Sequence, residues 1–251
     1  MAETILVTGA SAGFGQAICQ RLVADGHRVI GAARRIEKLQ ALHKELGEAF
    51  YHLQMDVTDL TQVDQALSSL PKAWEQIDVL VNNAGLALGL APAHEAEIAD
   101  WLTMIQTNII GLTYLTRQIL PRMVERNEGY VINMGSTAGT VPYPGANVYG
   151  APKSFVKQFS LNLRADLAGK QIRVTNIEPG LCEGTEFSSV RFKGDEKRVE
   201  ALYRDAHAIQ PEDIANTVSW LIQQPKHVNV NRIEIMPVSQ TFGPQPVYRG
   251  D

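Results

Sequence analysis

Tyr149 and Lys153 stand four residues apart, and Ser136 lies thirteen residues before the tyrosine, at the end of an apolar run. Side chains at positions i and i+4 share one face of a helix, so the phenol and the ammonium can meet. An ammonium beside a phenol lowers a pKa that is ordinarily about 10. With the serine hydroxyl holding a substrate oxygen, this set predicts proton transfer to or from an alcohol or a carbonyl. The spacing by itself also fits a solvated helix face.

A glycine-rich turn joins a predicted strand at 4–8 to a predicted helix at 14–25. Glycines permit a tight turn and a close approach of the backbone to a ligand. The N-terminus of the helix behind them offers free N–H groups and a positive dipole to a pyrophosphate. The order strand, turn, helix favours a dinucleotide site over an ordinary turn. We therefore predict cofactor contacts from Gly9, Ser11, Gly13, Phe14 and Gly15.

Two arginines, Arg34 and Arg35, follow the predicted second strand at 28–33. A site for NAD usually has Asp or Glu at this place, bonded to the ribose 2′-hydroxyl. Cations just before a helix N-terminus are disfavoured by the helix dipole, so these arginines need an explanation. A 2′-phosphate on the cofactor supplies one, because a guanidinium can pair with a phosphate through two hydrogen bonds. We predict NADP as the cofactor, with Arg34 as the main contact and Arg35 beside it. The alternative is that both arginines simply face solvent.

Short apolar runs alternate with longer amphipathic segments along the chain. Strands are predicted at 4–8, 28–33, 50–53, 78–81, 130–134, 172–177 and 232–236, and helices at 14–25, 36–46, 60–70, 98–107, 109–126, 149–167 and 214–222. Apolar strands separated by helices indicate a parallel sheet covered on both faces. We predict one α/β domain over residues 1–251, a Rossmann-like, doubly wound parallel sheet of about seven strands with helices on both faces.

Residues 1–140 of this domain would mainly bind the dinucleotide, and 141–251 would hold the catalytic helix, a substrate lid and a C-terminal arm. The lid is predicted at 183–207, which is polar and irregular, and the arm at 237–251, which needs a neighbouring surface to order it. We expect the arm to serve oligomerisation.

Composition limits the classes of function. A net charge of −4 and the lack of a long basic tract argue against nucleic-acid binding. Cys19 and Cys182 have no metal-ligand spacing, so we expect free thiols, a reducing compartment and no metal. We see neither a secretory signal nor an apolar stretch of membrane-spanning length. A cytoplasmic protein without membrane contact is the expectation.

The whole set of motifs resembles the classical short-chain dehydrogenase/reductase family along nearly the full chain. The matching pieces are Thr8 to Gly15, Asp56-Val57, Asn82-Asn83-Ala84-Gly85, Asn108, Ser136, Tyr149 with Lys153, and Pro179-Gly180 followed by Thr185. The resemblance implies that Tyr149 is the general acid/base and that Ser136 orients the substrate oxygen. It implies that Lys153 bonds the nicotinamide ribose and lowers the Tyr149 pKa, and that Asn108 kinks its helix and holds a water in a relay to Lys153.

The resemblance also implies further cofactor contacts. Asp56 would meet the adenine amino group, Asn82 and the turn to Gly85 would lie beside the adenosine and stabilise the sheet, and Thr185 would reach the carboxamide. The full implied set is Asp56, Val57, Asn82, Ala84, Gly85, Tyr149, Lys153, Pro179, Gly180 and Thr185. Plain alternatives are a simple turn at Asn82-Asn83, a helix cap at Asn108 and a solvated Lys153.

Pro152 lies between the catalytic tyrosine and lysine. Proline in a helix interior costs about 3 kcal/mol, but it is tolerated in the first turn, where its missing N–H would have no partner. We therefore expect the helix to begin within a few residues of Tyr149.

The second half resembles the NADP-dependent branch of the family that acts on 3-hydroxy acids. The segments that match are 179–187, 190–195 and 229–237. This resemblance implies oxidation of serine, allo-threonine and related 3-hydroxy acids, and reduction of malonic semialdehyde. A small acid needs a cation for its carboxylate, and Arg191 in the lid is the candidate, with a surface or intersubunit role as the alternative.

Two other functions stay open at this point: a reductase of unrelated ketones, aldehydes or sugars, and an inactive NADP-binding regulator. The presence of Tyr149, Lys153 and Ser136 argues against the regulator. The family resemblance also implies a homotetramer.

Overall fold

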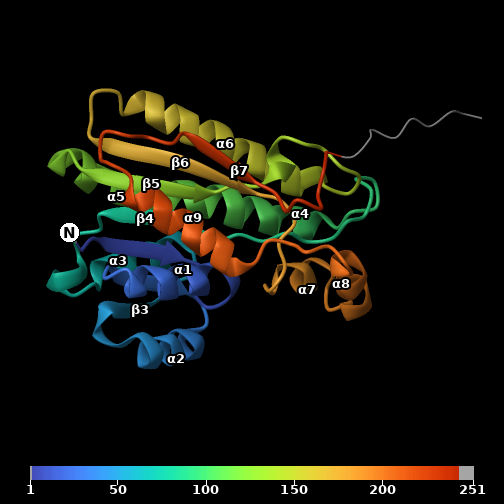
Figure 1. Cartoon of the computed structure of the whole chain (residues 1–251), viewed down its shortest axis with the longest axis horizontal. Helices are drawn as coiled ribbons and strands as arrows, with labels where there is room; N and C mark the ends of the chain where they lie inside the picture. The colour runs from blue at the N-terminus through green and yellow to red at the C-terminus, as the bar shows by residue number, and fades with distance from the viewer. Residues whose placement is uncertain (1, 243–251) are drawn as a thin grey trace, which may run out of the picture.

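Seven parallel strands form one sheet in the order β3-β2-β1-β4-β5-β6-β7 in a computed structural model that describes residues 2–242 (Figure 1). The strands are β1 (Thr4–Thr8), β2 (Arg28–Ala33), β3 (Phe50–Gln54), β4 (Val79–Asn82), β5 (Gly129–Met134), β6 (Ile172–Pro179) and β7 (Arg232–Ile235). Every strand begins and ends within two residues of its predicted bounds. The predicted parallel sheet is therefore confirmed.

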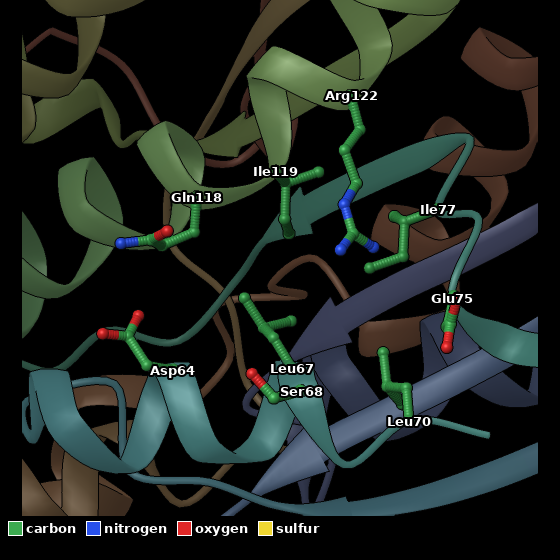
Figure 2. Close-up of a pocket in the computed structure, with 9 residues that line it drawn as sticks. All are labelled: Asp64, Leu67, Ser68, Leu70, Glu75, Ile77, Gln118, Ile119 and Arg122. Atoms are coloured by element: carbon green, nitrogen blue, oxygen red, sulfur yellow. The ribbon is translucent and has the colours of Figure 1, made fainter. Parts of the chain in front are cut away.

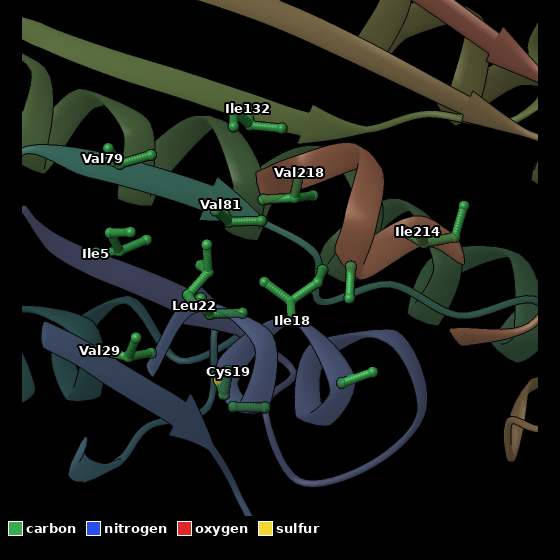
Figure 3. Close-up of a cluster of buried hydrophobic side chains, with 14 of the residues drawn as sticks. Ile5, Ile18, Cys19, Leu22, Val29, Val79, Val81, Ile132, Ile214 and Val218 are labelled. Carbon is green, nitrogen blue, oxygen red and sulfur yellow. The ribbon is translucent and has the colours of Figure 1, made fainter. Parts of the chain in front are cut away.

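Helices cover both faces of this sheet. One layer holds α1 (Gly13–Ala24), α2 (Ile36–Leu46) and α9 (Pro211–Gln223), and the other holds α3 (Leu60–Ser68), α5 (Leu112–Arg126) and α6 (Asn147–Asp166). Successive side chains of a strand point to opposite faces, so Ile5 and Val7 of β1 pack in the first layer while Leu6 packs in the second. Figure 3 shows part of this first layer, which includes Ile18 of α1 and Val218 of α9.

The order of the strands places a binding crevice at their carboxyl ends. The chain runs outward from β1 to β2 and β3, and then returns to β4 on the other side of β1. Such a reversal opens a crevice above the sheet between β1 and β4. Because all strands are parallel, the segments after β1 to β6 meet at this one edge. The predicted site residues lie in these segments or in the strand ends and helices that adjoin them.

Two regions differ from the predicted elements. The lid segment, expected to be irregular, contains α7 (Phe187–Arg191) and α8 (Glu196–Tyr203), which lie together at one end of the molecule (Figure 1). The helix expected to stop near Asn108 instead continues from α4 (Ile98–Ile105) through a π-helical turn (Gln106–Gly111) into α5. The described residues also contain short 3₁₀ turns at Gly47–Ala49, Lys72–Trp74 and Thr137–Gly139. Residues 243–251 of the predicted C-terminal arm lie outside the described residues.

The start of α6 agrees with the prediction made from Pro152. The helix begins at Asn147, two residues before Tyr149. Pro152 is its sixth residue, one turn further in than expected, so a residue with an N–H there would donate to the carbonyl of Val148.

Among residues 2–242, no helix combines the length and the apolar character that crossing a membrane requires.

Candidate active site

Tyr149 and Lys153 lie on one face of α6, and both side chains are buried, with exposed fractions of 8% and 7%. The Lys153 ammonium donates to the carbonyl of Met134 at the end of β5 over 2.8 Å, and its Nζ lies 5.9 Å from the centre of the Tyr149 ring. Ser136, two residues beyond β5, accepts from the N–H of Ala138 at 3.1 Å and so caps the 3₁₀ turn that follows it. Strand β5 thus anchors both partners of the tyrosine.

The pKa values of the pair are set by burial. Burial raises the pKa of Tyr149 well above its ordinary value, and the Ser136 hydroxyl and the Arg191 guanidinium offset only part of this effect. Burial lowers the pKa of Lys153 to about 8. Desolvation disfavours both charged forms, the phenolate as well as the ammonium, so the net pKa of Tyr149 lies above its ordinary value. The lowering by Lys153 that the resemblance implies remains a prediction.

Asn108 lies in the π-helical turn and is almost fully buried. Its side-chain oxygen accepts from the N–H of Leu86 at 3.0 Å, and its amide nitrogen donates to the Leu86 carbonyl at 2.8 Å. A Cβ added to Gly85 would lie 2.9 Å from Asn108 Oδ1 and 3.5 Å from Lys153 Nζ, so the two side chains flank this glycine. The distortion of the helix is confirmed, and the cap alternative is wrong. The relay water remains a prediction.

The glycine-rich turn leads directly into α1, whose first residue is Gly13. The helix has no side-chain cap, so N–H groups of its first turn are free to bind an anion. Gly13 has a positive φ of 54°, and a Cβ there would lie 3.1 Å from the side chain of Thr185. The structure thus brings Thr185 of the lid against the turn. Its predicted contact with the carboxamide remains a prediction.

The turn after β4 lies beside the glycine-rich turn. The Thr8 hydroxyl accepts from the N–H groups of Asn83 at 3.0 Å and Ala84 at 2.9 Å, which fixes the path of residues 82–85. Asn82 itself is buried, and its amide donates to Thr116 and Asn133 inside the protein. These bonds join β4 to α5 and β5, as a sheet-stabilising role requires, whereas a cofactor contact would have to come from the Asn82 backbone.

Two further predicted contacts follow β3. Asp56 Oδ1 accepts from the N–H of Thr58 at 2.9 Å and from its hydroxyl at 2.8 Å, which fixes the carboxylate at the carboxyl edge of the sheet. The Val57 side chain is buried in the second core layer. As for Asn82, only the backbone of Val57 remains for a cofactor contact.

The two arginines after β2 have different surroundings. Arg34 is exposed, and within residues 2–242 its side chain has no hydrogen-bond partner. Arg35 donates to the Ser11 hydroxyl at 3.0 and 3.2 Å and forms an ion pair of 2.8 Å with Glu186. A 2′-phosphate fits beside this cluster because Arg34, at the end of β2, is a cation without a partner in the described part of the chain. The uncapped α1 and these cations together fit a phosphorylated dinucleotide.

Arg191, the last residue of α7, faces Tyr149. Its guanidinium carbon lies 5.3 Å from the centre of the Tyr149 ring and 5.5 Å from that of Tyr143. Its Nε donates weakly to the carbonyl of Gly89 at 3.4 Å, and Nη2 is buried without a partner among the described residues. An unpaired buried donor is costly, and a substrate carboxylate would satisfy it.

Apolar side chains surround the phenol, and we did not predict them. The Phe187 ring stands edge-on to the Tyr149 ring, with 5.6 Å between the centres. The cluster also contains Ala87, Met104 and Ala138, packed against Leu86, Leu88, Trp101 and Val148. Phe187 lies two residues after Thr185, a predicted cofactor contact, so its position in the sequence could have indicated that it lies near the site. Nothing in the local sequence marked Trp101 or the ion pair of Glu186.

A separate cavity of about 240 Å³ lies between α3 and α5 (Figure 2). Leu67, Ile77, Ile119 and Arg122 are among its lining residues. It contains none of the predicted site residues, and Ile77 precedes β4, so the cavity lies toward the amino end of that strand. We therefore place the active site at the carboxyl edge of the sheet and not in this cavity.

Comparisons with known proteins identify relatives of this chain. The family model described as short chain dehydrogenase matches residues 3–196. A probable NADP-dependent dehydrogenase of Haemophilus influenzae is 59% identical over 95% of both chains. An NADP-dependent 3-hydroxy acid dehydrogenase of Salmonella typhi is 58% identical over 98% of this chain and 99% of the relative. The closed form of a serine dehydrogenase complexed with NADP+ superposes with a TM-score of 0.97 at 55% identity, covering 98% of this chain and all of that one. The chain therefore belongs to the short-chain dehydrogenase family.

Proposed function

We propose that this protein is an NADP-dependent dehydrogenase of small 3-hydroxy acids, such as L-serine and L-allo-threonine, and that it reduces malonic semialdehyde in the reverse direction. The observation that carries the proposal is the buried Nη2 of Arg191 beside Tyr149, which has no hydrogen-bond partner among residues 2–242. It supplies one site for a carboxylate within a short distance of the group that transfers the proton. The activities named for the related proteins of Salmonella typhi and of known structure support the same substrate class.

Each residue of the site has its own role in the proposed reaction. NADP, when bound, accepts or supplies the hydride at C4 of its nicotinamide. Ser136 holds the oxygen of the substrate, and Tyr149 exchanges a proton with that oxygen. The raised pKa of Tyr149 keeps the phenol protonated at neutral pH, so it is ready to act as an acid in reduction. Lys153 and Asn108 would support the proton relay, and oxidation of L-serine would give an aminomalonate semialdehyde that loses CO₂.

The experiment is a substrate panel with both cofactors. Initial rates with NADP⁺ and NAD⁺ would be measured for L-serine, D-threonine and L-allo-threonine, alongside reduction of malonic semialdehyde with NADPH. Simple alcohols without a carboxylate are the matched control. We expect turnover of the acids with NADP⁺ and little turnover of the alcohols. Faster turnover of ketones, aldehydes or sugars that lack the acid group would favour the alternative reductase.

We also propose a homotetramer in the cytoplasm. Exposed apolar side chains on neighbouring helices support association, namely Ile98 and Leu102 on α4 and Phe155 and Leu161 on α6, with exposed fractions of 38–64%. The free thiols Cys19 and Cys182 support a reducing compartment. Light scattering after gel filtration would give the mass, and a monomer at micromolar concentration would remove the tetramer.

A further inference from the structure

Glu186 joins the lid to the opposite side of the cofactor crevice. It directly precedes α7, and its two carboxylate oxygens accept from the Arg35 guanidinium at 2.8 and 3.0 Å. Oε1 also accepts from Lys38 in the first turn of α2 at 3.0 Å. Arg35 is itself oriented by two bonds to the Ser11 hydroxyl. Residues from the glycine-rich turn, α2 and the lid therefore meet in one charged cluster.

The neighbours of Glu186 reach into the active site on both sides. Thr185 packs against Gly13 of the glycine-rich turn, and Phe187 packs edge-on against Tyr149. Four residues further on, Arg191 faces the same tyrosine. Displacement of the start of α7 would therefore disturb the cofactor crevice and the substrate pocket together.

We propose that Glu186 is a positioning residue whose ion pairs with Arg35 and Lys38 hold α7 across the cofactor crevice. This inference rests on the proposed function, because it takes the crevice as the NADP site. In this arrangement the cations after β2 have different roles. Arg35 and Lys38 hold the lid, whereas Arg34, exposed and without a described partner, is left for the 2′-phosphate.

The carboxylate is charged at every working pH. The bond from Arg35 and the bond from Lys38 hold the pKa of Glu186 at about 2. The side chains of Glu186, Arg35 and Lys38 are about half exposed, with fractions of 48%, 40% and 45%, so salt will weaken the pairs. Losing them should change cofactor release by roughly two- to fivefold, as expected for exposed ion pairs.

A different arrangement predicts the opposite effect of removing the Glu186 carboxylate on the binding of NADPH. If the 2′-phosphate took Arg35 for itself, it would compete with the Glu186 carboxylate. Removing the carboxylate would then tighten the binding of NADPH and leave NADH unchanged. In the arrangement that we propose, removing it loosens the lid over both cofactors, because the lid covers the crevice whatever the 2′ substituent is.

The test measures cofactor release by stopped-flow fluorescence for Glu186→Gln, with Glu200→Gln on α8 as a control of equal charge change in the same lid. Binding of NADPH to the wild-type protein, measured first, tests the proposed cofactor site separately. We expect Glu186→Gln to release NADPH and NADH faster and to raise KM for L-serine more than it lowers kcat. Glu186→Asp should restore part of the effect, and Glu200→Gln should match the wild type.

Lys38→Gln removes the ion pair between Lys38 and Glu186 by changing the residue on α2. It keeps the test informative if Glu186→Gln folds poorly. We expect faster release of both cofactors here too, and an effect in the double variant smaller than the sum of the two single effects. Unchanged release in both single variants, or slower release of NADPH alone, would overturn the proposal.

Discussion

The Nζ of Lys153 lies 5.9 Å from the centre of the Tyr149 ring and donates its hydrogen bond to the carbonyl of Met134. The ammonium is thus held near the phenol by the end of β5. Both groups are buried, and burial raises the pKa of the phenol while it lowers that of the amine. The pair therefore favours a protonated phenol at neutral pH, and oxidation of an alcohol needs further positive charge beside it.

The lowered pKa of Lys153 makes stability depend on pH. The folded amine has a pKa of about 8 and the unfolded amine has the ordinary value of 10.5, so the unfolded chain binds more protons between these values. Relative to Lys153→Met, the wild-type free energy of unfolding should therefore rise between pH 8 and 9.5, by at most about 1.4 kcal/mol per pH unit. Urea unfolding of both cofactor-free proteins measures this. A difference that stays constant with pH would contradict the buried ammonium.

Arg34 should set the preference for NADP over NAD. Its guanidinium is exposed at the end of β2, where a 2′-phosphate can pair with it. We expect Arg34→Ala to reduce the ratio of kcat/KM with NADP⁺ to that with NAD⁺ by about 10- to 100-fold, the loss of a charge-assisted bond. Lys44→Ala, an exposed cation further along α2, is the control. An unchanged ratio would remove Arg34 from the phosphate site.

Arg191 should determine the affinity for the acid group. The buried Nη2 would bond the carboxylate, so Arg191→Gln should raise KM for L-serine by about 10- to 100-fold. Arg204→Gln removes an exposed lid cation and should leave KM unchanged. The slow turnover of alcohols without a carboxylate should be equal in all three proteins. A KM for L-serine that is unchanged in Arg191→Gln would show that the substrate carboxylate binds elsewhere.

A second ion pair holds the lid just beyond α7. Lys193, two residues after Arg191, pairs with Asp100 of α4 at 2.8 Å. Because this pair lies near Arg191, Asp100→Asn should raise KM for L-serine by roughly two- to fivefold and leave cofactor release unchanged. Steady-state and stopped-flow measurements on one preparation separate the two effects. An altered release rate without a change in KM would contradict the assignment of this ion pair to substrate binding.

The strands and the local motifs of the site could be predicted from the spacing of residues close in the sequence. The glycine-rich turn and the Tyr149–Lys153 pair depend on residues close in the sequence, and the alternation of apolar runs gave every strand. The position of Pro152 correctly indicated that α6 begins within a few residues of Tyr149, although Pro152 lies in the second turn and not in the first.

Long-range packing decided the features that were not predicted. Glu186 and Arg35 are 151 residues apart and meet only because the lid folds back across the crevice. The direction of the Tyr149 pKa depends on desolvation by the surrounding apolar side chains, which no four-residue spacing contains. The amide of Asn108 is bonded to Leu86, which requires the path of the chain after β4.

The most direct test of the account is Tyr149→Phe, assayed for serine oxidation and for NADPH binding in one preparation. The substitution removes only the hydroxyl, and the ring can keep its contact with Phe187. We predict that kcat falls by about 10²- to 10⁴-fold, while the Kd for NADPH stays close to that of the wild type. Substantial turnover by a variant that still binds NADPH would contradict Tyr149 as the proton-transferring group.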